Sequence, residues 1–242
     1  MFGKDPREHP HLAAMVGALA RAAGDRLESV VLYGSAARGE YHPETSDLNL
    51  LVVLRDLEPS TLELLSAPFA RWEREGQPPP RLFSAELIAQ ASDVFPLELL
   101  DLSGFHVVLH GNDPLAGVEI RRDWLRLQCE RELREKLMRL REGYVACHGR
   151  PAELTQLITT SYTTFVALFR GCLYLLGAPA PRRNAEAVAA FCERAGLDAS
   201  AFDAVERLKR GERLADEPRT VFSRYYAELT RACRAVDRFE AR

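Results

Sequence analysis

The fold is decided by the stretch Val30-Val31-Leu32-Tyr33-Gly34-Ser35-Ala36-Ala37-Arg38-Gly39 and by Ser46-Asp47-Leu48-Asn49-Leu50, which follows after six residues. A short apolar run that ends at a glycine and a serine is typical of a buried strand that leaves the sheet through a tight turn. A second apolar run covers residues 48–54 and predicts the next strand. It is bounded by Pro43 and Ser46 before it and by Arg55 and Asp56 after it.

The turn and the second strand carry polar groups that can hold a phosphate and a metal ion. Gly34 lacks a side chain, so a phosphate can approach the backbone N–H groups, and the Ser35 hydroxyl can donate to a phosphate oxygen. Asp47 and Asn49 stand two residues apart and therefore point to one face of the strand. Polar side chains there are costly unless that face is wet or holds an ion. Each feature alone is typical of an ordinary turn or a half-exposed strand end, but together they indicate a nucleotide site.

The order of these residues resembles the signature of a known family. Gly-Ser-Ala-Ala-Arg-Gly begins at Gly34, and Asp47 and Asn49 follow after seven further residues. This pattern is similar to that of the nucleotidyltransferase superfamily related to DNA polymerase β. It most resembles the minimal nucleotidyltransferases and the aminoglycoside adenylyltransferases. The resemblance implies an α/β (α+β) fold, with a mixed-sheet nucleotidyltransferase domain over residues 1–118 and an all-α helical bundle over residues 119–242.

The resemblance also implies a reaction. Members of the family transfer a nucleoside monophosphate from a nucleoside triphosphate to a hydroxyl group, and Mg²⁺ ions held by acidic residues position the triphosphate and activate the acceptor. Gly34 and Ser35 are expected to grip the phosphates of ATP or another nucleotide. Arg38 is expected to lie near the phosphates or to brace the loop. Asp47 is expected to be the first metal ligand and a catalytic residue.

A third acid is expected on an extended segment beside the first two strands. Residues 95–102 are predicted to be extended, and within them Glu98 matches the family's acid best, with Asp101 second. Residues three apart on a strand point to opposite faces, so at most one of the two can join the site. The expected metal ligands are thus Asp47, Asn49 and Glu98, and Glu98 is the second expected catalytic residue.

Asn49 departs from the family pattern, which has a second aspartate at this position. An asparagine offers one neutral carbonyl oxygen, whereas a carboxylate bridges two cations and brings a full negative charge. Affinity for Mg²⁺ is therefore expected to fall. Two interpretations stay open. One is a slow or unusual nucleotidyltransferase, and the other is a catalytically silent relative that binds nucleotides or has a regulatory role.

The rest of the chain alternates helices and strands up to about residue 118 and then continues with helices alone. The first part is predicted to hold helices over residues 11–27, 60–75 and 85–91, the second of them interrupted near Pro68, and strands over residues 81–83 and 105–109. The second part is predicted to hold five amphipathic helices, over residues 124–144, 154–176, 185–195, 201–209 and 220–239.

Charge divides the chain in the same way. Residues 1–120 hold 9 Lys and Arg against 18 Asp and Glu, whereas residues 121–242 hold 23 against 17. Such asymmetry suggests two parts with different tasks. Opposite charges could help the halves dock, or the basic half could present a face to an anionic ligand.

Two features of the second half allow further interpretations. Its five cysteines include no C-x-x-C pair and fall mostly on apolar helix faces, so buried thiols are expected. Arg141 and His148 fit the loose spacing of ribonuclease domains that accompany minimal nucleotidyltransferases. A toxin–antitoxin component acting on RNA therefore stays open, beside an ordinary helix end where both residues meet the helix dipole.

No apolar run approaches the ~20 residues of a membrane span, and the first residues lack the apolar core of a signal peptide. A cytoplasmic protein without membrane association is expected. Its expected partners are a nucleoside triphosphate and an acceptor hydroxyl on a small molecule, a protein or RNA, and a homodimer is left open.

Overall fold

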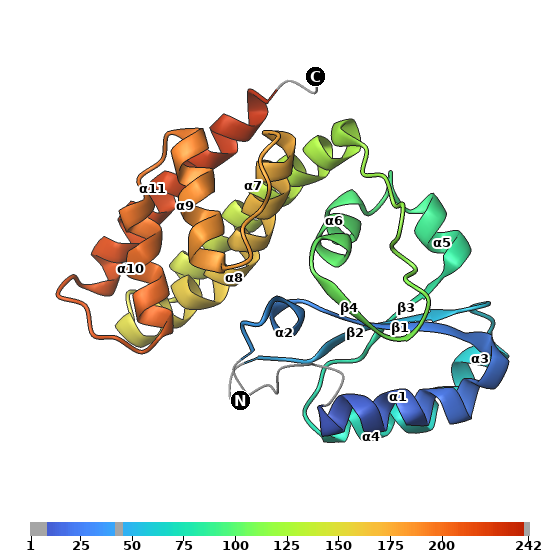
Figure 1. Ribbon diagram of the computed structural model, residues 1–242. Helices are drawn as coiled ribbons and strands as arrows, with labels where there is room; N and C mark the ends of the chain where they lie inside the picture. Colours follow the sequence, from blue (N-terminus) through green and yellow to red (C-terminus); the bar gives the residue numbers. More distant parts are fainter. Residues whose placement is uncertain (1–8, 42–45, 240–242) are drawn as a thin grey trace. The chain divides into compact units, whose positions relative to one another are not determined.

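The computed structural model describes residues 9–41 and 46–239 (Figure 1). Contacts divide the chain into two compact units, Met1–Ile120 and Arg121–Arg242. The first unit is built around a sheet and the second consists of helices. This confirms the fold class predicted from the sequence.

The sheet of the first unit is mixed and has the strand order β3-β2-β1-β4. Strand β1 is antiparallel to both of its neighbours, whereas β2 and β3 run parallel. The register pairs Tyr33 with Asn49 and Leu51 with Arg81. The strands are β1 (Leu27–Tyr33), β2 (Asn49–Leu54), β3 (Arg81–Ser84) and β4 (His106–Gly111).

Both faces of the sheet are covered by helices, so its central strands are apolar on both sides. Alternate residues of β1 and β2, such as Leu32 and Leu50, pack against Leu19 of α1 (Pro10–Ala23) and Trp72 of α4 (Ser66–Arg74). The opposite face, with Val31 and Leu51, is covered by α5 (Ala85–Gln90) and α6 (Pro96–Gly104). Figure 1 shows α1, α3 (Pro59–Leu64) and α4 on one side of the sheet and α5 and α6 on the other.

The segment predicted to be extended over residues 95–102 is instead helix α6, so that prediction is wrong. Pro96 occupies the first helical position, where its fixed φ suits a helix and its missing N–H costs nothing. Glu98 lies in the first turn, where a carboxylate interacts favourably with the helix dipole, and the leucines that follow are good helix formers. A short apolar run fits a buried strand and a buried helix equally well, and here the helix is formed.

Smaller differences concern element ends. Helix α1 ends at Ala23, and the 3-10 helix η2 (Gly24–Arg26) leads into β1, which begins three residues earlier than predicted. The helix predicted over residues 60–75 breaks into α3 and α4 at Leu65, so Pro68 lies in the first turn of α4, where proline is tolerated. The predicted strands at residues 48–54 and 105–109 are present as β2 and β4.

The second unit is a bundle arranged around α8, which packs against each of the four other helices. Its centre is aromatic: the Phe169 ring stacks on Phe191 at 4.3 Å between centroids and meets the edge of Phe202 at 5.4 Å. The helices are α7 (Arg122–Ala146), α8 (Pro151–Leu175), α9 (Asn184–Ala195), α10 (Ala199–Lys209) and α11 (Pro218–Asp237). Within the described residues, no helix is both long and apolar enough to span a bilayer.

All five cysteines are free and buried, which confirms the expectation of buried thiols. A hydrogen bond with Cys129 and burial both raise the pKa of Cys172. Burial is also the main cause that raises the pKa of Cys192, to about 12. These thiols therefore stay protonated at neutral pH and behave as small apolar side chains.

Gly111 ends β4 at a point where the backbone of β1 comes very close. Its φ is +74°, and a Cβ atom placed there would lie 1.9 Å from the Glu28 carbonyl oxygen. Gly117 has a similar φ of +79°, but a Cβ atom there would meet nothing within 4 Å. An alanine at either position would therefore meet similar backbone strain, but only at position 111 would its Cβ atom clash with a neighbour.

We expect Gly111→Ala to destabilise the first unit more than Gly117→Ala. Backbone strain alone should cost about 1–2 kcal/mol at either position, and the clash with Glu28 should add about 1–3 kcal/mol at Gly111. Urea unfolding followed by tryptophan fluorescence, with Trp72 buried in this unit, measures the difference. Equal losses of unfolding free energy would contradict the close approach of the two strands.

Candidate functional site

The turn after β1 has a backbone that glycine adopts readily. Gly34 has φ +79° and ψ −153°, and Ser35 opens the single-turn helix α2 (Ser35–Arg38). The turn is closed by three backbone hydrogen bonds. The Arg38 N–H donates to the Gly34 carbonyl (3.1 Å), the Gly39 N–H to the Ala36 carbonyl (3.2 Å) and the Glu40 N–H to the Ser35 carbonyl (2.9 Å). The chain thus leaves a buried strand and turns within a few residues, with Ser35 two residues after the end of β1.

Asn49 packs directly against this turn. It is the first residue of β2, half-buried, and pairs across the sheet with Tyr33. A Cβ atom on residue 34 would lie 3.1 Å from Asn49 Nδ2, so a side chain at this position would press on the Asn49 amide as well as strain the backbone at a φ of +79°. The approach to β2 is held by a hydrogen bond of 2.8 Å from the Leu48 N–H to Gln77 Oε1. Asp47, two residues before Asn49, is exposed.

Arg38 ties the turn to α6. Its Nε lies 3.6 Å from Glu40 Oε2 and its Nη1 lies 3.5 Å from Asp101 Oδ1, while its side chain is mostly buried. A partly buried guanidinium between two carboxylates holds its position more firmly than an exposed pair does. Its charge is therefore largely balanced by these two acids.

The two acids expected as alternatives lie on one helix instead of on a strand. Glu98 is half-buried in the first turn of α6, and Asp101 follows three residues later. Residues three apart on a helix lie on the same side, so the expectation that they point in opposite directions is wrong. The structure brings Asp101 to Arg38. Leu99 and Leu102, one residue after each acid, anchor the helix to the sheet.

Two residues that the sequence did not single out complete this face of the sheet. The guanidinium carbon of Arg81 lies 5.8 Å from the centre of the Tyr33 ring. Burial raises the pKa of Tyr33 above its usual value, and the nearby Arg81 partly offsets this by lowering it. The sequence held one signal for each: Tyr33 directly precedes the Gly-Ser turn, and Arg81 opens the third predicted strand.

The donor set does not fit the two Mg²⁺ ions that the family resemblance implies. In residues 9–41 and 46–239, no three His, Cys, Asp or Glu side chains converge as a metal site. Asn49 is neutral, Asp47 is exposed at the loop, and Asp101 is engaged by Arg38. A pair of divalent ions needs bridging carboxylates, and this arrangement does not supply them.

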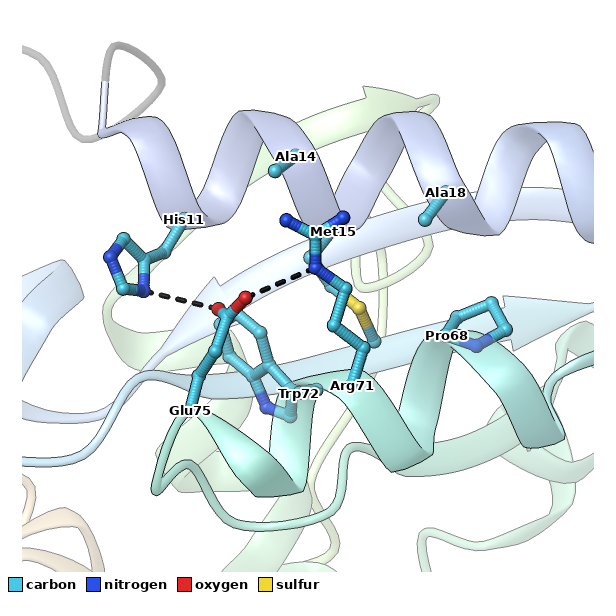
Figure 2. Close-up of a pocket in the computed structure, with 8 residues that line it drawn as sticks. All are labelled: His11, Ala14, Met15, Ala18, Pro68, Arg71, Trp72 and Glu75. Carbon is cyan, nitrogen blue, oxygen red and sulfur yellow. Dashed lines mark hydrogen bonds and ion pairs between the residues drawn. The ribbon is translucent and has the colours of Figure 1, made fainter.

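A small pocket lies on the opposite side of the sheet, between α1 and α4 (Figure 2). Glu75 lies at its rim, 3.2 Å from His11 Nδ1 and 3.1 Å from Arg71 Nε. Its volume of about 10 Å³ admits no more than a water molecule. This pocket is too small for a substrate.

The second unit places Arg141 and His148 at the end of α7. Arg141 Nε donates to the Tyr226 hydroxyl at 2.7 Å and lies over the same ring. His148 is exposed, just beyond the helix, with φ +46°. These contacts give Arg141 a structural partner, and the RNA-directed interpretation stays a prediction.

Comparisons with known proteins agree with this arrangement. Residues 17–122 match the family model described as nucleotidyltransferase domain. Among solved structures, the chain is similar to spectinomycin adenyltransferase AAD(9) from Enterococcus faecialis, crystallised with ATP and spectinomycin. The TM-score is 0.56 at 13% sequence identity, and the match covers 90% of this chain and 98% of that chain, a likeness of fold. No curated protein sequence matches the chain. The region of residues 17–122 therefore belongs to the nucleotidyltransferase domain family.

Proposed function

We propose that the first unit binds a nucleoside triphosphate at the Gly34–Ser35 turn and transfers its nucleoside monophosphate to an acceptor hydroxyl. The observation that carries this proposal is the close contact between Gly34 and Asn49 inside a nucleotidyltransferase domain. It keeps the turn bare of side chains where phosphates must approach backbone N–H groups. ATP is the proposed nucleotide, since the similar spectinomycin adenyltransferase was crystallised with it.

The proposed reaction is an in-line displacement. The acceptor oxygen forms a bond to the α-phosphorus, the bond from that phosphorus to the oxygen bridging to the β-phosphate breaks, and pyrophosphate leaves. Gly34 and Ser35 hold the phosphates. The hydroxyl proton passes to Asp47, an exposed carboxylate two residues from Asn49. Glu98, in the first turn of α6, is the second proposed catalytic residue.

The donor set favours a second candidate, a protein that binds nucleotides without turning them over. Asn49 removes one negative charge from the usual acidic set, and Arg38 neutralises Asp101. Such a protein keeps the phosphate-binding turn and has lost the groups that activate an acceptor. The two candidates share nucleotide binding and differ in turnover.

Gly34→Ala should weaken ATP binding far more than Gly39→Ala. Both glycines have φ +79°, but only at Gly34 would a Cβ atom press on Asn49 and on an approaching phosphate. We expect a loss of affinity of about 10-fold or more for Gly34→Ala and about 3-fold or less for Gly39→Ala, by isothermal titration calorimetry. Thermal melting of both variants checks the fold. Equal affinities for two folded variants would place the nucleotide elsewhere.

Asn49→Asp should raise Mg²⁺-dependent release of pyrophosphate by about 10-fold or more over a slow wild-type rate, because it adds a carboxylate beside Asp47. The assay combines each of the common nucleoside triphosphates with spectinomycin, protein and RNA acceptors. Adding Asp47→Asn to this variant should return the rate to background. If neither wild type nor Asn49→Asp turns over any nucleotide, the transferase proposal fails and the binding protein remains.

A further inference from the structure

We propose that the guanidinium of Arg81, stacked on Tyr33, binds the triphosphate and supplies the positive charge that a metal ion would otherwise bring, so that nucleotide binding here is largely independent of Mg²⁺. This inference rests on the proposed nucleotide site at Gly34 and Ser35. It starts from the finding that the side chains near Asn49 do not fit two Mg²⁺ ions. It assigns the binding of the phosphates in part to Arg81, the first residue of β3.

The sheet register places Arg81 on the same face as Asn49. Strand β3 runs parallel to β2 with Arg81 opposite Leu51, and side chains alternate along each strand. Leu51 shares its face with Asn49, and Phe83 joins Leu51 in the core beneath α5 and α6. Arg81 therefore stands on this face, one strand away from Asn49 and at the same end of the sheet.

Tyr33 links Arg81 to the phosphate-binding turn. The Tyr33 ring lies 5.8 Å beneath the guanidinium carbon, and the residue pairs with Asn49 and directly precedes Gly34. Arg81 also hydrogen-bonds to the Tyr33 side chain, so Tyr33 limits the rotation of the guanidinium and leaves its other N–H donors available. The fork of donors suits two oxygens of a phosphate.

Arg81 has a charge that is open to a ligand, unlike Arg38. It is exposed, and none of the ion pairs formed among the described residues involves it. Arg38 is held by two carboxylates.

The change in charge explains why a metal would no longer be required. A site with several carboxylates repels the phosphates of ATP unless divalent ions lie between them. Here one carboxylate is replaced by the amide of Asn49, and the cation of Arg81 stands on the neighbouring strand. Attraction between a guanidinium and phosphate oxygens then replaces the bridging ion.

The test is the affinity for ATP, measured by calorimetry in Mg²⁺ and in EDTA. Wild type should bind ATP with affinities within about 3-fold of each other in the two conditions, and Arg81→Gln should weaken binding in EDTA by about 10-fold or more. Arg81→Lys keeps the charge but loses the fork of donors, so its affinity should lie between those of wild type and Arg81→Gln. Arg55→Gln is the matched control, because Arg55 is exposed at the opposite end of β2 and should bind as wild type does.

The outcomes separate this inference from the function on which it rests. If wild type binds ATP in Mg²⁺ but about 30-fold or more weakly in EDTA, or if Arg81→Gln binds as wild type does, the inference is overturned and the nucleotide site stands. If wild type binds no nucleotide in either condition, the proposed function falls as well. Arg81→Lys guards against misfolding, since a loss of affinity in Arg81→Gln that lysine partly restores is a loss of charge and not of the fold.

Discussion

The contact between Gly34 and the Asn49 amide sets the geometry of the first unit. It lies where the end of β1 meets the start of β2, and a Cβ atom on residue 34 would lie 3.1 Å from Asn49 Nδ2, close enough to displace the amide. Tyr33 lies opposite Asn49 in the sheet register, and the Tyr33 ring contacts Arg81 from the next strand but one. The position of the Asn49 amide thus depends on the absence of a methyl group at position 34.

The helix α6 joins this face to the turn. Leu99 and Leu102 bury themselves against the sheet, and this packing directs Asp101 toward Arg38 and Tyr33. The acid therefore serves to hold the turn, because its charge is already engaged by a guanidinium. A carboxylate in this position stabilises the loop and is poorly suited to bind a metal ion at the same time.

Local pattern was sufficient for most of the fold. The apolar runs around Gly34 and Asn49 predict two neighbouring strands, and helical spacing after residue 118 predicts the bundle, because each signal lies within one element. The segment at Pro96 failed because a short run of leucines carries no period that separates strand from helix. Arg81 was missed for another reason. Its place beside Tyr33 comes from the pairing of β2 with β3, which joins residues some thirty positions apart, and no local pattern encodes that register.

The buried cysteines of the second unit give the bundle an internal reporter. All five sulfurs are out of reach of solvent while the helices stay packed. A hydrogen bond with Cys129 and burial raise the pKa of Cys172, and burial raises the pKa of Cys192 and Cys233. A thiol-specific reagent therefore reacts at the rate at which the helices separate rather than at the rate of surface chemistry. Four of the five cysteines lie one each in α7, α8, α9 and α11, and the fifth, Cys147, directly follows α7. Alkylation can therefore follow the opening of individual helices without any added label.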